Sequence, residues 1–393
     1  MRHLAVLASL LALSSFAVAA DEAPLPGTKP LTISKPLDEV MVDGISHFAH
    51  RAAENSPAAR AAKWNWATSG PEAYGTSVAG HRQRLRTIIG AVDSRTPSPR
   101  IDIIVPLLED SPVAEGDAYS VHHVTWSVLD GVNAEGLLLV PGGTDWTGFV
   151  VALPDADWTP EMFAGLQPGV AAQAQLARRL VENGCVVLVP TLISRSDEFS
   201  GNPLVRFTNQ PHREFVYRMA FQMGRHIIGY EVQKVLAGVD ALERIQSKLS
   251  KANPKRARLS IGVVGLGEGG LLALHAAALE PRIASTLVCG YFQQREAVWR
   301  EPIYRNLWSQ LTEFGDAEIA SLVAPRSLVI EACAVPEISG PPAPRAGRSG
   351  GAAPGRIETC TLGTVRTEYD RARVHYDKLK AADRFIFVSS GEG

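Results

Sequence analysis

The sequence has little cysteine, little net charge, and no long hydrophobic run beyond its first twenty residues. Its 393 residues include four cysteines whose spacing matches no metal-site pattern, and we expect neither a metal nor a cofactor. A disulfide is allowed in an oxidising compartment but not required by a domain of this size, and Cys333 and Cys360 form one candidate pair. A formal net charge of −2 argues against a nucleic-acid partner, which would need a basic face.

The one long hydrophobic run lies at the start of the chain. Leu4–Val18 is almost wholly apolar, follows a basic start, and is closed by small residues at Ala19 and Ala20. This layout is typical of a secretory signal peptide that is cleaved after Ala19 or Ala20. The run is shorter than the ~20 apolar residues that span a bilayer. We therefore expect a signal peptide at 1–20 and a secreted or periplasmic protein with no membrane span after cleavage.

Two regions are expected after the signal peptide. Residues 21–98 combine a proline-rich linker with a helical extension, and helices are predicted over Leu37–Glu54, Pro57–Trp66 and Val78–Ala91. Residues 99–393 begin with strand patterns at Ile101–Val105, Val121–Val128 and Gly136–Val140. Turn residues separate the second and third of these strands, so we expect an antiparallel hairpin there.

From Phe149 onward, strands and helices alternate. The predicted strands are Phe149–Leu153, Cys185–Val189, Leu259–Val264, Ile283–Val288, Ser327–Ile330 and Arg384–Val388. The predicted helices are Val170–Glu182, Arg213–Ser247, Leu271–Leu279 and Arg366–Lys380. This alternation predicts an α/β fold with a mostly parallel sheet, an antiparallel start to that sheet, and helices on both faces.

A glycine-rich turn between a buried strand and an apolar helix is the main candidate for a functional motif. It reads Gly265-Leu266-Gly267-Glu268-Gly269-Gly270. As G-x-G-x-x-G it matches the dinucleotide fingerprint, in which glycines let the backbone approach a pyrophosphate. That fingerprint needs an acidic residue at the tip of the next strand, ~20 residues later, but this strand ends in Val288, Cys289 and Gly290. A dinucleotide-dependent oxidoreductase using Gly265–Gly270 is therefore the weaker alternative.

The same turn fits a nucleophile elbow, the G-x-S-x-G motif that lifts a serine into a cleft on a sharp strand-to-helix turn. Gly265, Gly269 and Gly270 meet the need for small residues where strand and helix come close. The serine position is occupied by Gly267, which has no nucleophile. The sequence thus predicts the shape of an elbow without its reacting group.

Three stretches carry a family resemblance: Gly229–Asp240, Ile261–Ala277 and Ala324–Ile330. On these stretches, the chain from about Leu85 to its carboxyl end resembles the secreted acetyl-xylan-esterase-like and dienelactone-hydrolase-like branch of the α/β-hydrolases. The resemblance implies an α/β-hydrolase fold over residues 99–393 and descent from ester hydrolases. It also implies a histidine-bearing loop and a closing helix after the last strand. The sequence stops at that loop, which leaves open a chain that continues beyond Gly393.

The resemblance directs the search for a catalytic acid and base. In such folds the acid follows a strand after the elbow, and the histidine follows the last strand. Glu331 and Glu337, at or after the tip of Ser327–Ile330, are candidate acids, with a solvated loop carboxylate as the alternative. Glu268 is a further catalytic candidate, but the dipole of the elbow helix would lower its pKa and favours a structural role. No histidine follows the last predicted strand.

The remaining candidates would line the cleft. Backbone amides near Asp155 and Ala156, together with that of Glu268, would form the oxyanion hole. Trp158 beside them would either stack on a sugar or cap the core. Arg195 and His212 lie on the segment that leaves the Cys185–Val189 strand, where ligands bind in such sheets.

Two functions from different classes follow from these residues. One is an esterase-like hydrolase of acylated carbohydrate or another small ester, which would need an unusual nucleophile or a carboxylate-activated water. The other is a catalytically inactive binding or scaffold protein that keeps the cleft without the chemistry. In both, the expected partner is a small-molecule or carbohydrate ester.

Overall fold

The computed structural model describes residues 26–29, 32–64, 66–67, 69–105, 112–200, 208–254 and 257–390. The predicted signal peptide lies outside these residues. Contacts divide the chain into two units, one ending at Ala52 and one starting at Ala53. The regular structure of the first unit is helix α2 (Leu37–Glu54), as predicted, which ends just inside the second unit. None of the helices in the described residues is long and apolar enough to cross a membrane.

The second unit opens with three short helices where the sequence predicted two. They are α3 (Ser56–Lys63), α4 (Pro71–Ser77) and α5 (Ala79–Ile88). Pro57 and Pro71 stand in the first turns of α3 and α4, where a missing backbone N–H costs no hydrogen bond. The buried guanidinium of Arg60 anchors α3 because it donates to Glu318 at 3.0 Å and to Glu296 at 2.9 Å.

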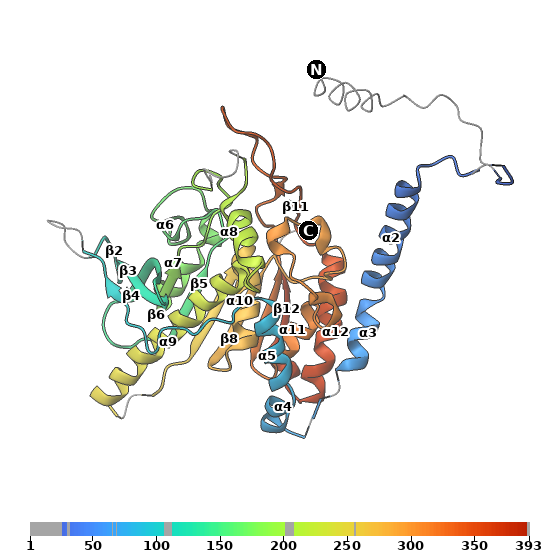
Figure 1. The fold of residues 1–393 in the computed structure, drawn as a ribbon. Helices are drawn as coiled ribbons and strands as arrows, with labels where there is room; N and C mark the ends of the chain where they lie inside the picture. The colour runs from blue at the N-terminus through green and yellow to red at the C-terminus, as the bar shows by residue number, and fades with distance from the viewer. Residues whose placement is uncertain are drawn as a thin grey trace, which may run out of the picture. The chain divides into compact units, whose positions relative to one another are not determined.

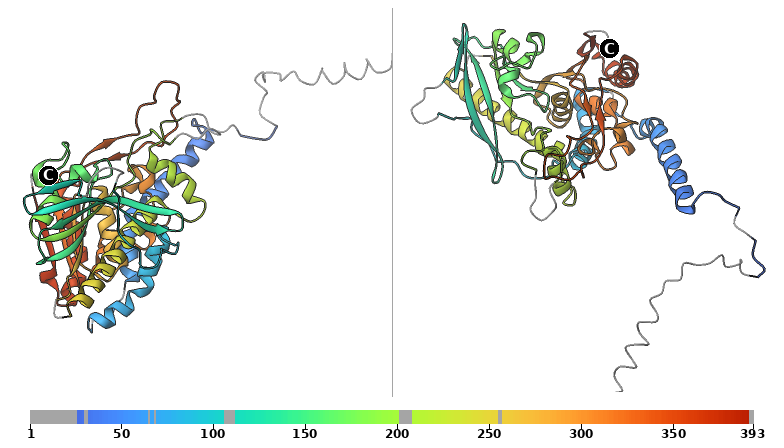
Figure 2. Two further views of the ribbon diagram at one scale, coloured as in Figure 1. Left: turned by 90° about the vertical axis from the view of Figure 1, so that its left-hand side faces the viewer. Right: turned by 90° about the horizontal axis from the view of Figure 1, so that it is seen from above.

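The main sheet runs in the order β1-β3-β4-β6-β5-β7-β8-β9-β12, with β2 paired to β3 (Figure 1). Its strands are β1 (Asp102–Ile103), β2 (Ala114–Gly116), β3 (Tyr119–Leu129), β4 (Val132–Pro141), β5 (Gly148–Leu153), β6 (Cys185–Pro190), β7 (Ile261–Leu266), β8 (Ile283–Cys289), β9 (Ser327–Ala332) and β12 (Phe385–Ser389). Pairing is antiparallel from β1 through β4 to β6 and parallel from β6 to β12. The predicted hairpin, β3–β4, stands toward one end of the sheet, as the view from above in Figure 2 shows.

The helices of the α/β region follow the predicted alternation. They are α6 (Pro160–Phe163), α7 (Leu176–Glu182), α8 (His212–Phe221), α9 (Ile227–Ala252), α10 (Glu268–Leu279), α11 (Asp316–Val323) and α12 (Leu362–Lys378). Single 3₁₀ turns lie at 172–174, 298–300, 303–305, 310–312 and 382–384. A separate antiparallel pair, which the sequence did not predict, joins β10 (Ile338–Ser339) to β11 (Arg356–Ile357).

The single helix predicted over Arg213–Ser247 is wrong, because the chain breaks it into α8 and α9. Gly224 between them has a φ of 65°, a left-handed conformation that ends a helix. His226 then starts α9, since its Nδ1 accepts the backbone N–H of Ile228 at 3.1 Å.

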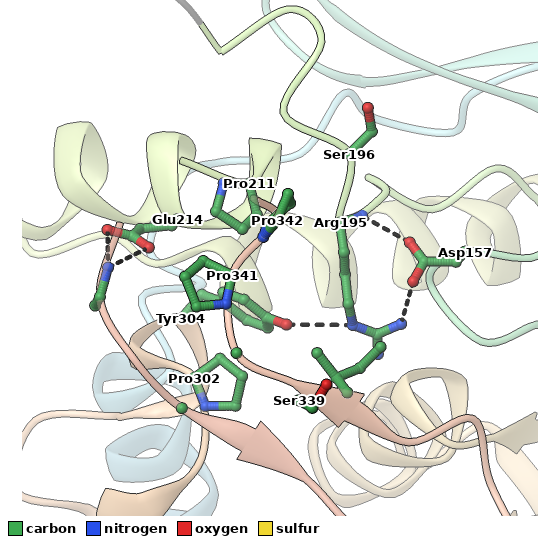
Figure 3. Close-up of a pocket in the computed structure, with 14 residues that line it drawn as sticks. Asp157, Arg195, Ser196, Pro211, Glu214, Pro302, Tyr304, Ser339, Pro341 and Pro342 are labelled. Atoms are coloured by element: carbon green, nitrogen blue, oxygen red, sulfur yellow. Dashed lines mark hydrogen bonds and ion pairs between the residues drawn. The ribbon is translucent and has the colours of Figure 1, made fainter. Parts of the chain in front are cut away.

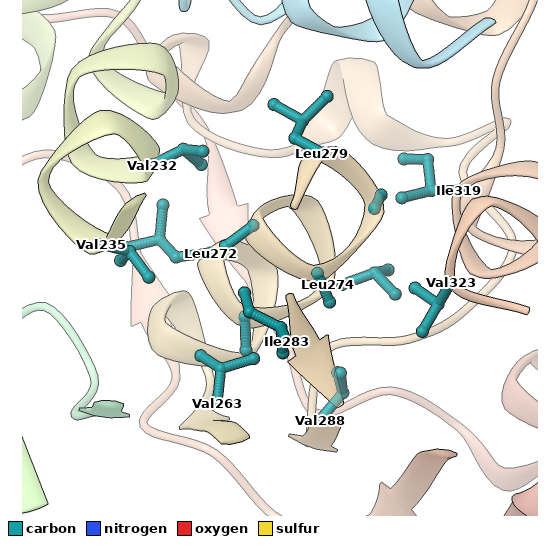
Figure 4. Close-up of a cluster of buried hydrophobic side chains, with 14 of the residues drawn as sticks. Val232, Val235, Val263, Leu272, Leu274, Leu279, Ile283, Val288, Ile319 and Val323 are labelled. Atoms are coloured by element: carbon teal, nitrogen blue, oxygen red, sulfur yellow. The ribbon is translucent and has the colours of Figure 1, made fainter. Parts of the chain in front are cut away.

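The central core lies between the sheet and helices α9, α10 and α11. Every residue of α10 is buried, as expected for a helix that is apolar all round. Figure 4 shows Leu272, Leu274 and Leu279 of this helix packed among valines and isoleucines of the neighbouring elements. This packing fixes the start of α10, and with it the glycine turn, against the sheet.

Helices cover the second face of the sheet only in part. Helices α6 and α7 pack there on β4 and β6. Further along, the side chains of Val264, Leu287, Val329 and Ile386 form a row across β7, β8, β9 and β12. These four are half-buried or exposed, and Ile386 is 46% exposed. The expectation of helices on both faces is therefore confirmed, and in the described part of the chain the helices of the second face cover the end of the sheet at β4 and β6.

Candidate functional site

The glycine turn forms a sharp bend from strand to helix. β7 ends immediately before Gly267 and α10 begins immediately after it. Gly267 has a φ of 58° and a ψ of −116°, which side-chain-bearing residues rarely adopt. Its backbone N–H donates to the carbonyl oxygen of Cys289 at 3.0 Å. Gly267 therefore lies at the carboxyl end of β7, the end of the sheet at which the other parallel strands also finish.

Close backbone contacts explain the other three glycines of the turn. A Cβ atom on Gly265 would lie 2.1 Å from the carbonyl oxygen of Gly269. A Cβ atom on Gly269 would lie 2.2 Å from the carbonyl oxygen of Leu153. A Cβ atom on Gly270 would lie 2.9 Å from the carbonyl oxygen of Cys289. The start of α10 thus approaches β5, β7 and β8 too closely for side chains at these positions.

The side chain of Asp155, which follows β5, lies over this turn. Its Oδ1 accepts the backbone N–H of Glu268 at 2.9 Å. A Cβ atom on Gly267 would lie 2.5 Å from the same oxygen. The sequence assigned the Glu268 amide to an incoming ester oxygen, but in the structure this donor is bound by a carboxylate of the chain itself. Ala156, the neighbour of Asp155, is buried.

The space next to Gly267 is very small. Its volume is about 10 Å³, and it is bounded by Asp155, Tyr291, Arg295 and Arg305, among others. A single water needs roughly 10–15 Å³ of such volume. An ester group therefore has no room to approach the turn.

Three buried arginines converge on Glu268. Arg213 donates to its Oε1 at 2.9 Å, and Arg195 and Arg305 donate to its Oε2 at 3.2 and 2.7 Å. Burial alone would raise the pKa of this carboxyl, but the three arginines outweigh burial and hold the pKa well below its ordinary value. Glu268 is therefore ionised at any physiological pH and is a poor proton donor or acceptor.

Arg195 links the carboxylate of Glu268 to the carboxylate of Asp155, which lies over the turn. Its two terminal nitrogens contact Asp155 at 2.5 and 3.2 Å, a bidentate pair. The same guanidinium reaches Asp157 at 3.1 Å and the hydroxyl of Tyr304 at 3.2 Å. The candidates Asp155, Arg195 and Glu268 thus form one buried ionic network, which leaves none of these side chains available as a base.

His212, a candidate cleft residue and the nearest histidine to the site in the sequence prediction, lies at the start of α8 in a contact with Ser194. The hydroxyl of Ser194 is 3.1 Å from Nδ1, and the backbone N–H of Phe199 donates to Nε2 at 2.9 Å. Because a backbone N–H can only donate, Nε2 carries no proton and Nδ1 carries the proton of the neutral ring. Nδ1 then donates to Ser194 and cannot remove the hydroxyl proton. This pair holds the loop and does not form a catalytic dyad.

The other candidates lie apart from the network. Glu331 accepts the thiol of Cys289 at 2.9 Å and also the hydroxyl of Ser390. Glu337 accepts the backbone N–H of Thr359 at 3.3 Å. Trp158 packs on the core beside Phe163, with 6.3 Å between the ring centroids. Sequence reasoning missed Arg305 and Tyr304, which belong to the network.

A larger cavity of about 470 Å³ lies beside the network (Figure 3). Arg195, Tyr304 and Asp157 form one wall, and Glu214 of α8 forms another. The facing wall belongs to residues 338–357, which we call the strap because its ends pair as β10 and β11.

Hydrogen bonds from the α8 side of the site hold the strap. The side chain of Asn209 donates to the carbonyl oxygen of Pro342 and accepts the backbone N–H of Gly351. Glu214 accepts the backbone N–H of Ala353 at 3.0 Å. The stretch rich in glycine, proline and arginine is therefore an ordered wall of the cavity.

No family model matches the chain, and no curated protein matches it by sequence. By structure it is similar to a protein from Bacteroides fragilis NCTC 9343 described as a candidate acetyl xylan esterase, with 14% identity and a TM-score of 0.56 over 87% of this chain and 81% of that chain. It is more distantly similar to a family 15 glucuronoyl esterase from Caldicellulosiruptor kristjansonii, with 13% identity and a TM-score of 0.46 over 82% of each chain. The Bacteroides likeness, with the strand order, shows an α/β-hydrolase fold.

Proposed function

We propose that this chain, an α/β-hydrolase fold without a nucleophile, binds an acylated carbohydrate or another small ester and does not cleave it. One observation carries the proposal: the Asp155 carboxylate fills the space over Gly267 and binds the Glu268 N–H. Hydrolysis by this fold needs both a nucleophile at that place and a free donor for the oxyanion. Neither is available here.

Carboxylate-activated water, the other route to hydrolysis, has little support in the site. Asp155 is bound by Arg195 and by a backbone N–H, and Glu268 is bound by three arginines. A general base must have a pKa near the working pH, whereas the arginines keep Glu268 ionised and weakly basic. The Asp155 carboxylate likewise argues against a dinucleotide, since its negative charge would repel a pyrophosphate at the start of α10.

The cavity beside the network has the size and chemistry of a carbohydrate site. Its volume of about 470 Å³ lies within the roughly 300–1,000 Å³ of small-molecule sites. The apolar faces of a sugar ring fit the rings of Tyr304 and of four prolines, and its hydroxyls fit the carboxylates of Asp157 and Glu214. Acetyl xylan, named for the similar Bacteroides protein, supports an acetylated xylo-oligosaccharide as the first ligand to test.

Calorimetric titration of the purified chain with acetylated xylo-oligosaccharides, followed by assay of released acetate, tests this function. We expect binding without acetate release. Ala353→Trp should weaken binding roughly tenfold or more by filling the cavity, while Ala352→Trp, one residue outside its lining, should bind as the wild type does. Enzymatic release of acetate would overturn the non-hydrolytic role. Equal binding by both variants would exclude this cavity, and no binding would exclude this ligand.

We also propose that the protein is exported, on the strength of the apolar run and small residues of 1–20. Amino-terminal sequencing of extracellular or periplasmic material should find Ala20 or Asp21 as the first residue. Exported protein that begins at Met1 would contradict the signal peptide.

A further inference from the structure

Three charged side chains line the cavity of about 470 Å³. Two are the carboxylates of Asp157 and Glu214, and the third is the guanidinium of Arg195 (Figure 3). None of the other residues that Figure 3 draws around the cavity has a charged side chain. The hydrogen bonds that these three groups already make therefore determine which charge a ligand can bring into the cavity.

The guanidinium of Arg195 has no N–H left for a ligand. A guanidinium carries five N–H groups, one on Nε and two on each terminal nitrogen. Nε donates to the hydroxyl of Tyr304 at 3.2 Å. One terminal nitrogen donates to Asp155 at 2.5 Å and to Asp157 at 3.1 Å, and the other donates to Asp155 and Glu268, both at 3.2 Å. All five N–H groups are thus used within the chain.

Asp157 is the charged group of this cluster that a ligand can reach. Its side chain is 39% exposed, compared with 2% for Asp155 and 6% for Arg195. Its two oxygens accept the backbone N–H of Arg195 at 2.8 Å and the guanidinium at 3.1 Å. Because a carboxylate oxygen has two acceptor sites, each oxygen keeps one for a ligand. The two aspartates share the single positive charge of Arg195, so this corner of the cavity is negative.

Glu214, on another wall, contributes an acceptor whose charge is offset. Its carboxylate pairs with Arg218, one turn later in α8, at 2.7 Å, and accepts the backbone N–H of Ala353 at 3.0 Å. Its side chain is only 2% exposed. The preference of the cavity for the charge of its ligand therefore depends on the wall at Asp157.

Hydroxyl groups supply the side-chain donors beside Asp157. The hydroxyl of Tyr304 accepts a hydrogen bond from Arg195, and that of Ser196 accepts the backbone N–H of Glu198 at 3.2 Å, so each can donate its own proton. Sugar hydroxyls match these groups, because they both donate and accept. A sugar carboxylate would find no guanidinium N–H to pair with, and an unpaired charge is costly to desolvate.

We propose that Asp157 is a specificity-determining residue that makes the cavity accept neutral and amino sugars and reject uronic acids. This inference rests on the proposed function, because it concerns the carbohydrate that occupies the same cavity. An ammonium group would pair with the free acceptor sites of Asp157. A uronate would bring a like charge against them, and such a contact weakens binding roughly tenfold or more.

The test varies one group of one ligand. The ligand is an acetylated xylo-oligosaccharide with a glucuronic acid branch, whose carboxyl group is left free, converted to a methyl ester, or converted to an aminoethyl amide. Calorimetric titration of the full chain should show that the methyl ester binds roughly tenfold or more tightly than the free acid, and that the cationic amide binds at least as tightly as the ester. In about 1 M NaCl, where the Debye length is about 3 Å, the difference between acid and ester should shrink.

Two variants assign the preference to Asp157. Asp157→Asn should bring the affinity for the free acid to within about threefold of that for the methyl ester. Asp117→Asn removes the same charge from the exposed turn between β2 and β3 and should keep the wild-type difference. Circular dichroism checks that both variants fold, and the salt dependence of the wild type needs no substitution.

The outcomes separate this inference from the proposed function. Equal binding of the acid and the ester by the wild type would overturn the inference and leave carbohydrate binding intact. A full difference that persists in folded Asp157→Asn would also overturn it, because another group would then reject the acid. Binding of none of the three ligands, nor of the unbranched oligosaccharide, would contradict the proposed function itself.

Discussion

The backbone N–H of Glu268 donates to the carboxylate of Asp155 at 2.9 Å, across 113 residues of sequence. In an esterase of this fold, that N–H would stabilise the negative oxygen of the reacting ester. Here a fixed negative charge of the protein already holds it. The turn therefore has the backbone of a nucleophile elbow, but the N–H that would bind the ester oxygen is already bound by the Asp155 carboxylate.

Gly267→Ser should not create an esterase and should destabilise the protein. The new Cβ would lie 2.5 Å from Asp155 Oδ1, and the φ of 58° is unfavourable for serine. We expect a loss of about 1–3 kcal/mol in the free energy of unfolding, measured by urea denaturation, and no turnover of p-nitrophenyl acetate. Gly262→Ser is the control, since its Cβ would make an ordinary 3.4 Å contact on the same strand. Rapid ester turnover by Gly267→Ser would show that Asp155 leaves the site readily.

A fluorophosphonate probe should not label the wild-type chain. Two serines contact a histidine in the described residues: Ser120 contacts His122 within β3, away from the glycine turn, and Ser194 contacts His212. Ser194 accepts a hydrogen bond from His212 and keeps its own proton. Labelling beside an active serine esterase as positive control, with peptide mapping, checks this expectation. A label on Ser194 would show that the histidine changes its tautomer and works as a base.

Removing the carboxylate of Glu268 should strongly destabilise the fold. Glu268→Gln leaves three buried arginines with one fewer counter-charge, and breaking a buried ion pair costs about 3–5 kcal/mol. Glu182→Gln is the control, because it breaks only a surface pair with Arg178 and should leave the urea midpoint unchanged. Similar midpoints for the two variants would mean that water enters the network and screens its charges.

Glu368 should make the protein less stable as the pH rises. Burial, only partly offset by Arg371, raises the pKa of Glu368 from 4.5 to about 7. The folded state therefore binds this proton more tightly, and the stabilisation, fully present below pH 4.5, is lost as the pH rises to about 7. The difference in free energy of unfolding between the wild type and Glu368→Gln should fall by roughly 3 kcal/mol over this range.

The comparison with Glu368→Gln is necessary because buried and half-buried histidines act in the opposite direction. Burial lowers the pKa of His226 to about 3 and those of His275 and His375 to about 4. These groups make the folded state more stable as the pH rises toward their ordinary value of 6.5. Urea denaturation of both proteins at several pH values isolates the contribution of Glu368, and parallel curves would contradict its raised pKa.

The alternation of apolar strands and helices was sufficient to predict the α/β fold. The hairpin was predictable because turn residues separate two β-branched runs, and it forms as β3–β4. The break between α8 and α9 was missed although Gly224 marks it, since the apolar periodicity continues across the break. Residue patterns within short stretches thus placed most elements. The end of α8 and the start of α9, in contrast, depended on the left-handed conformation of one residue, Gly224.

The sequence predicted only those parts of the site that are formed by residues close together in the chain. The sequence placed Glu268 on the first turn of its helix, where the structure has it. The partners of Glu268 come from three segments far away in the chain, and charged side chains are normally expected at the surface. Arg213 and Arg305 therefore gave no sign of burial, which results from mutual neutralisation within the folded chain.

Because Asp155 fills the space of the absent nucleophile, no single mutation gives this protein an esterase site. A serine at position 267 meets the carboxylate, and loss of that carboxylate alone deprives the buried Arg195 of its bidentate partner. Both first steps lower stability before any activity appears, so natural selection would oppose each of them. Under the binding role proposed here, the buried charge of Asp155 therefore opposes the evolution of ester hydrolysis at this turn.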